Sequence, residues 1–210
     1  MNIKVTVTND VLKRIEKSFD NPNPFFSFLG ERFLELTRQN ILAGKQPNQR
    51  QFLHNNPITE KVKGGNRPLL DKTHLLKSLK YAFTKRGLIL GTNLIYAAIQ
   101  HWGGIIKAKK QFLTIPLMRK ARQVGIGAGP KKFGGDKLNA GLFFWRSKKT
   151  KNCFLVKRIG TKKKPRLEFW YWLKKWVRIP PRAIFPKGNI KGYPKYVQCI
   201  LDSIKFWLKI

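Results

Sequence analysis

The side chains best suited to metal binding or thiol chemistry are few in this chain and are scattered along it. Among its 210 residues are three histidines, His54, His74 and His101, and two cysteines, Cys153 and Cys199. No histidine has a cysteine or a carboxylate at the spacing that a metal site requires. Two cysteines without such spacing are also too few for a disulfide scaffold, which favours free thiols in a reducing cytoplasm. The sequence therefore predicts no metal site.

Acidic and nucleophilic residues do not form a catalytic constellation either. Of the 10 Asp and Glu residues, the pair Glu31 and Glu35 lies one helical turn apart, which is typical of a solvated helix face. Ser147 and Ser203 have no neighbouring base that would activate a hydroxyl nucleophile. We therefore predict no catalytic residues and no enzymatic activity.

A glycine-rich segment at residues 125–135 is the part of the chain most similar to a phosphate-binding loop. Its run Gly-Ile-Gly-Ala-Gly continues into Pro130 and Lys131 instead of a helix start. No buried strand precedes it, and the Gly-Lys-Ser/Thr signature is missing. No nucleotide or other cofactor is predicted.

The charge of the chain is its most unusual property. It has 44 Lys and Arg against 10 Asp and Glu, a net charge of +34, and Asp136 is the single acid between Asp71 and Glu168. Self-repulsion on this scale indicates a counter-charge, which nucleic acid, a membrane surface or an acidic partner could supply. No window approaches the roughly 18 apolar residues of a membrane span, and no long basic amphipathic helix is predicted, so a membrane partner is not expected.

Two kinds of segment could meet nucleic acid. The first is a set of clustered lysines that we name as candidates to face DNA: Lys148, Lys149, Lys151, Lys162, Lys163 and Lys164. The second is the aromatic run at 168–177, whose rings are interleaved with Lys174, Lys175 and Arg178 and could stack bases. Large apolar residues that alternate in a strand also suit a protein core or a subunit interface, so the aromatic run stays open between these roles.

The elements that would position these residues can be predicted from periodicity. In the first half of the sequence, the pattern of apolar and polar residues predicts a strand at 3–8, amphipathic helices at 11–19 and 25–43, and an exposed loop at 44–68. A short helix capped by Thr73 and a hairpin of residues 80–84 and 88–90 follow. A short helix then ends at Gly103 and Gly104, with Tyr96, Ile99 and Gly103 on its docking face.

The second half predicts strands and one closing helix. Strands are expected at 142–146, 152–158 and 167–173, an extended proline-rich segment at 179–186, and a helix at 194–208. That helix should pack through Val197, Ile200, Leu201, Ile204 and Leu208. We predict an α+β fold, an antiparallel sheet covered by two N-terminal helices and a C-terminal helix. The core domain would comprise residues 1–106 and 169–210, and a basic β-rich insertion residues 107–168.

Three segments, in this order, resemble motifs of one known family. They are Arg-Pro-Leu-Leu-Asp-Lys-Thr-His-Leu-Leu-Lys-Ser-Leu at 67–79, Leu-Gly-Thr-Asn-Leu-Ile-Tyr-Ala-Ala-Ile-Gln-His-Trp-Gly-Gly at 90–104, and Ile-Pro-Pro-Arg-Ala-Ile-Phe at 179–185. Together they are similar to the phage virion morphogenesis family, the tail-completion proteins of Mu-like phages. The chain departs from the family pattern at Gln100-His101, which is in reversed order, and at Ala183, which replaces a proline.

This resemblance implies a structural protein that completes the tail or joins head to tail during virion morphogenesis. It implies a homo-oligomeric ring, with a hexamer expected, other neck or tail proteins as partners, and a location in the virion after assembly in the bacterial host cytoplasm. Nonspecific contact with DNA fits the charge, and a sequence-nonspecific nucleic-acid-binding protein is the alternative. The candidate structural or interface residues are Tyr96, His101, Trp102, Gly103, Gly104, Pro180, Arg182 and Phe185.

Overall fold

The computed structural model describes residues 23–84, 87–124, 141–161 and 164–208. These residues form helices and antiparallel strands, which confirms the α+β class. The strand expected at 3–8 and the helix expected at 11–19 lie outside the described residues. Within the described part, the strands belong to three separate antiparallel sheets and not to one.

The chain packs as two compact units. The first comprises Met1–Phe52, Lys72–Trp102 and Arg182–Ile210, and the second comprises Leu53–Asp71 and Gly103–Pro181. These limits differ from the expected core and insertion, because strand pairing draws residues 103–106 and 169–181 into the second unit.

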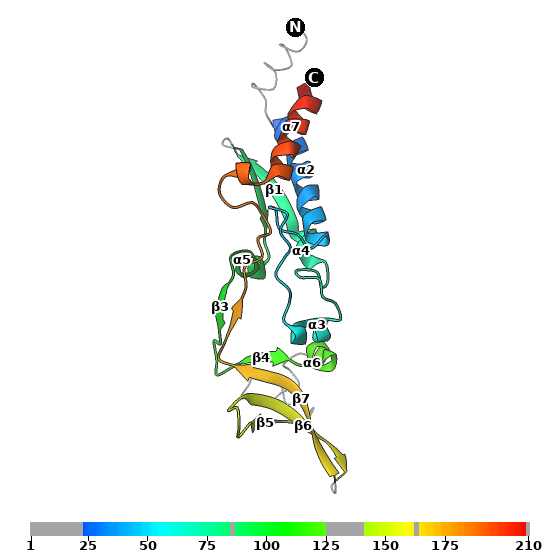
Figure 1. Cartoon of the computed structure of the whole chain (residues 1–210), viewed down its shortest axis with the longest axis vertical. Helices are drawn as coiled ribbons and strands as arrows, with labels where there is room; N and C mark the ends of the chain where they lie inside the picture. Colours follow the sequence, from blue (N-terminus) through cyan, green and yellow to red (C-terminus); the bar gives the residue numbers. More distant parts are fainter. Residues whose placement is uncertain (1–22, 85–86, 125–140, 162–163, 209–210) are drawn as a thin grey trace, which may run out of the picture. The chain divides into compact units, whose positions relative to one another are not determined.

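The first unit is built on two long helices and a hairpin. Helix α2 (Asn23–Leu42) and helix α7 (Pro194–Leu208) lie side by side, and the hairpin of β1 (Leu79–Thr84) and β2 (Gly87–Thr92) packs against α2 (Figure 1). Leu29 and Phe33 of α2 form a buried cluster with Tyr196 and Cys199 of α7. The predicted helix at 25–43 and the predicted hairpin are therefore confirmed.

The face of α7 that packs inward is only partly the predicted one: Ile200 packs against the buried cluster as expected. Tyr196, Cys199 and Ser203 are buried, at spacings of three and four residues, whereas Leu201 and Ile204 are exposed. The Tyr196 hydroxyl lies 2.8 Å from the hydroxyl of Thr37, and burial of the ring raises the Tyr196 pKa. The buried hydroxyl of Thr37 on α2 thus favours burial of the Tyr196 side of α7, which hydrophobic periodicity alone does not predict.

Two short helices flank the hairpin. Helix α4 (His74–Ser78) begins after Thr73 as expected, but Thr73 has a left-handed φ of 57° and makes no side-chain cap bond. The hydroxyl of Ser78 instead lies 2.6 Å from that of Thr92, which joins the end of α4 to the end of β2. Helix α5 (Ile95–Trp102) follows β2 directly.

The segment predicted to be an exposed loop contains a helix. Helix α3 (Pro57–Lys63), in the second unit, is capped by the Asn56 side chain, which accepts a hydrogen bond from the Ile58 amide at 3.0 Å. Asn followed by Pro is a helix-start signal, because the amide oxygen caps and proline fits the first turn. Its short length and single buried residue, Val62, leave too little periodicity to detect.

A four-stranded antiparallel sheet dominates the second unit, in the order β4-β7-β6-β5. Its strands are β4 (Leu113–Pro116), β5 (Leu142–Arg146), β6 (Cys153–Thr161) and β7 (Lys164–Lys174). Helix α6 (Arg119–Val124) covers it: Ala121 packs with Leu155 and Tyr171, and the Tyr171 hydroxyl donates to the Ala121 carbonyl at 2.7 Å. The β-rich character predicted for this region is confirmed.

A separate two-stranded ribbon completes the second unit. It pairs β3 (Gly104–Lys107) with β8 (Trp176–Ile179) in antiparallel register. All four residues of β3 are exposed. An isolated two-stranded ribbon is only marginally stable and gains stability from further packing. The exposed apolar side chains of β3 are available for such packing.

Candidate functional site

Helix α5 of the first unit presents two adjacent side chains, Gln100 and His101, to the segment that begins at Arg182. Ala97 and His101 are the buried residues of this helix, one turn apart. The predicted docking face of Tyr96, Ile99 and Gly103 is therefore wrong: the Tyr96 side chain is 46% exposed. The helix docks through a small residue and a polar ring because its partner is an extended backbone with amides to satisfy.

Arg182 is joined to Gln100 by two hydrogen bonds. Its backbone amide donates to the Gln100 carbonyl at 2.7 Å, and its Nη1 donates to Gln100 Oε1 at 3.0 Å. The Arg182 side chain is 5% exposed, and this burial lowers its pKa. A buried guanidinium needs acceptors to offset the loss of water, and the side-chain amide of Gln100 supplies one.

His101 accepts hydrogen bonds from two further amides of the same segment, those of Ile184 and Phe185. Its Nδ1 lies 3.1 Å from the Ile184 nitrogen and 3.4 Å from the Phe185 nitrogen. An imidazole nitrogen that accepts from amides carries no proton, so His101 is neutral in this arrangement. Burial, and secondarily the charge of Lys187, lowers the His101 pKa to about 4.

We name these four bonds, between Gln100 and His101 of α5 and residues 182–185, the α5 clamp. Rings surround it: the His101 ring lies 4.6 Å from that of Trp102 and 6.0 Å from that of Phe185, centroid to centroid. The Lys187 ammonium lies 4.3 Å from the Trp102 ring centroid. The neutral His101, engaged by two amides, and Gln100 thus fix the course of the backbone at residues 182–185.

The remaining predicted site residues lie in the second unit, where they shape the backbone. Gly103 has φ of 73°, and a Cβ there would lie 2.8 Å from the Pro181 nitrogen. Gly104 pairs with Ile179 in the β3–β8 ribbon, directly before Pro180. Gly103 therefore allows two backbones to approach more closely than a side chain permits, and Gly104 adopts a φ of 148° that favours glycine.

Of the lysines predicted to face DNA, the four that the structure describes fall into two groups. Lys148, Lys149 and Lys151 are exposed in the connection between β5 and β6, whereas Lys164 is exposed at the start of β7, opposite the end of β6. Lys162 and Lys163 lie outside the described residues. The length of β6 separates the two groups.

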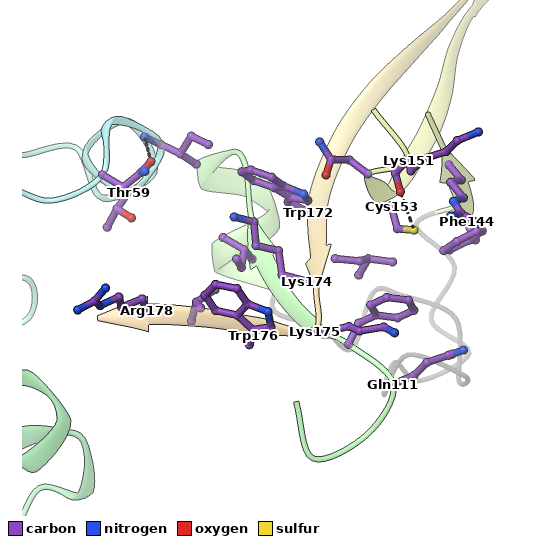
Figure 2. Close-up of a pocket in the computed structure, with 18 of the residues that line it drawn as sticks. Thr59, Gln111, Phe144, Lys151, Cys153, Trp172, Lys174, Lys175, Trp176 and Arg178 are labelled. Carbon is purple, nitrogen blue, oxygen red and sulfur yellow. Dashed lines mark hydrogen bonds between the residues drawn. The ribbon is translucent and has the colours of Figure 1, made fainter. Parts of the chain in front are cut away.

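The second unit also contains an open hollow of about 1290 Å³ beside β7 and β8, which we name the basic hollow (Figure 2). Its described lining includes five cations and no acid: Arg146, Lys151, Lys174, Lys175 and Arg178. Four large aromatic residues also line it: Phe112, Phe144, Trp172 and Trp176. The end of the aromatic run that the sequence left unassigned therefore lies in a basic environment.

Reasoning from sequence missed Gln100 and Lys187. Gln100 was expected to point away from the docked face, yet it binds Arg182 by main chain and side chain. The adjacency of Gln100 and His101 is the signal that could have found it, because consecutive residues can both reach an extended segment that crosses the end of a helix. Nothing in the sequence indicated that Lys187 lies over Trp102.

Within the part of the chain that the structure describes, no group of three or more His, Cys, Asp or Glu residues is placed to hold a metal ion. The described helices include none that is long and apolar enough to cross a membrane.

A comparison with protein families places these features in context. Residues 3–128, more than half of the chain, match the phage virion morphogenesis family. The chain therefore belongs to this family, whose proteins serve structure and assembly, and its role lies in building phage particles. Searches of curated proteins and of solved structures found no match.

Proposed function

We propose that this chain is a non-enzymatic structural protein that completes the tail or joins head to tail, in contact with other neck or tail proteins. Membership of the phage virion morphogenesis family over residues 3–128 is the observation that carries this proposal. The α5 clamp supports it, because its polar side chains fix the course of the backbone and none is arranged as an acid, base or nucleophile.

We propose further that the chain acts as a homo-oligomeric ring, with six copies expected, in the virion tail or at the head–tail junction. Helix α5 carries an apolar stripe of Ile95, Ala98, Ile99 and Trp102 at helical spacing. Ile95 is 97% exposed and Trp102 is 65% exposed. Exposed apolar side chains in one stripe favour a protein interface, and a ring repeats one such interface by rotation.

A phage that carries a stop codon in this reading frame tests the role in assembly. We expect separate heads and tails under the electron microscope and few infectious particles, with infectivity restored when the purified chain is added to the lysate. A normal yield of joined, infectious particles without the chain would contradict the proposal.

Light scattering at moderate salt, after nuclease treatment, tests the ring. We expect one defined oligomer that Ile95→Lys dissociates, because a charge in an apolar interface is costly. Leu42→Lys is the matched control, since Leu42 is also an exposed apolar residue on a helix of the first unit. A strict monomer that binds DNA tightly would overturn the ring.

A further inference from the structure

We propose that the basic hollow binds single-stranded nucleic acid, with a base on Trp176 and phosphates on Lys174 and Arg178. This goes beyond the assembly role and does not depend on it. The proposal rests on the order of side chains along β7 and β8, on the charge of the hollow, and on the way in which Trp172 is held.

Aromatic and cationic side chains alternate along this part of the chain. Trp172, Lys174, Trp176 and Arg178 occupy every second position across the end of β7 and the whole of β8. Trp172 and Lys174 therefore share one face of β7, and Trp176 and Arg178 share one face of β8, with about 7 Å between the members of each pair. Lys175 lies in a bend between the two strands, which belong to different sheets. Figure 2 shows the first three following one another along the hollow, so flat rings and positive charges are presented in turn.

The two tryptophans are accessible to different degrees and for identifiable reasons. Trp176 is 57% exposed. Trp172 is half-buried: its ring stacks on Phe154 with centroids 6.1 Å apart and planes 20° apart, and the Lys174 ammonium lies 3.8 Å from its centroid. Phe154 is the register partner of Trp172 on β6, and Trp145 of β5 is the partner of Phe154. Phe154 and Lys174 thus already contact the Trp172 ring, which forms a fixed wall of the hollow, and the exposed Trp176 is the ring that offers a face to a base.

The positive charge of the basic hollow favours an anionic ligand. Five cations without an acid among the described lining residues repel one another, and a phosphate backbone would relieve that repulsion. The hollow is larger than the roughly 300–1,000 Å³ of ordinary small-molecule sites. An open, basic, aromatic surface of this kind suits an extended polymer better than a single nucleotide.

The tryptophan rings favour single-stranded nucleic acid over a duplex or an acidic polypeptide. In a duplex the base faces are already stacked on one another, so exposed tryptophans would contribute little to binding. An acidic polypeptide would meet the cations but would have no base faces for the rings. Only unpaired bases use both kinds of side chain at once.

Fluorescence anisotropy with a labelled thymidine oligonucleotide tests the proposal on the full chain. Because a net charge of +34 attracts any polyanion, the informative variants leave charge unchanged. Trp176→Ala is expected to weaken binding at least fivefold, as for one lost base stack, whereas Trp176→Phe retains most of the affinity. Phe206→Ala is the matched control, because it removes an exposed aromatic ring from the first unit.

Two further measurements keep the proposal falsifiable if Trp176→Ala folds poorly. Wild-type tryptophan fluorescence should be quenched by the oligonucleotide and not by polyglutamate at the same salt. Arg178→Gln should reduce the slope of log affinity against log salt by about 0.7, the value for one phosphate contact on a single strand. The proposal is overturned if Trp176→Ala and Phe206→Ala bind alike, if duplex of equal length responds equally to Trp176→Ala, or if polyglutamate binds as tightly as the oligonucleotide.

Discussion

Protonation of His101 should open the α5 clamp, and a variant that cannot be protonated should remove this sensitivity to acid. The Nδ1 atom of His101 accepts from the amides of Ile184 and Phe185, and it can do so only without a proton. The change to make is His101→Asn, because the asparagine side-chain oxygen lies close to the position of Nδ1 and accepts amide protons at any pH.

The size of the effect follows from the His101 pKa, which burial and the charge of Lys187 lower from 6.5 to about 4. Between these values the unfolded chain binds a proton that the folded chain does not, so the free energy of unfolding falls as the pH falls. The stabilisation is complete above pH 6.5 and is lost as the pH drops toward 4. A pKa shift of this size contributes at most about 3 kcal/mol to the free energy of unfolding. Partial solvent screening places the expected contribution at roughly 1–3 kcal/mol.

Urea denaturation of wild type and His101→Asn from pH 8 to pH 4 provides the test. At low pH, electrostatic repulsion among the many cations destabilises wild type and His101→Asn alike. The quantity to compare is therefore the difference between their free energies of unfolding at each pH. We expect His101→Asn to be less stable at pH 8, where ring contacts are lost, and the gap to close as the pH falls. His74→Asn, on the exposed start of α4, should follow the wild type. A constant gap between wild type and His101→Asn across the range would refute the neutral, amide-bound histidine.

Three further substitutions probe the backbone and the buried polar groups. Arg182→Met should destabilise the first unit by about 1.5–3 kcal/mol in urea denaturation, because it removes a charged hydrogen bond to Gln100; an unchanged midpoint would contradict the clamp. Gly103→Ala should lower the melting temperature more than Gly188→Ala, because both glycines have positive φ but only Gly103 has backbone within 4 Å of the added Cβ; equal effects would contradict close packing at Gly103. Tyr196→Phe should cost about 1–2 kcal/mol, because it leaves the hydroxyl of its partner on α2 without that bond; a neutral result in calorimetry would show that the bond is dispensable.

Much of the local structure could be predicted from sequence because local rules govern it. Helix α7 begins and ends at the predicted residues, and the hairpin of β1 and β2 follows its turn signal. The left-handed φ of Gly103 was expected from its place after a short helix. Helix α3 escaped prediction because a seven-residue helix with one buried side chain has almost no periodicity.

Faces and partners were less predictable, since they depend on what packs opposite. The inward face of α7 packs on Leu29 and Phe33 of α2, and its Tyr196 hydroxyl meets that of Thr37, 159 residues away in sequence. The docked face of α5 is set by the amides of an extended segment more than 80 residues away. Hydrophobic periodicity contains no information on either partner.

By itself, the sequence determined the α+β class, the basic charge, the order of most helices and strands, and a resemblance to the family to which the chain belongs. These follow from composition, local periodicity and short motifs, which do not require knowledge of distant contacts. Only the tertiary structure decided that Gln100 and His101 hold the segment at Arg182, and that Trp172 and Trp176 line the basic hollow. The reason is physical: a buried hydrogen bond or a shared surface depends on which distant residues the fold brings together, and that choice is made by the whole chain at once.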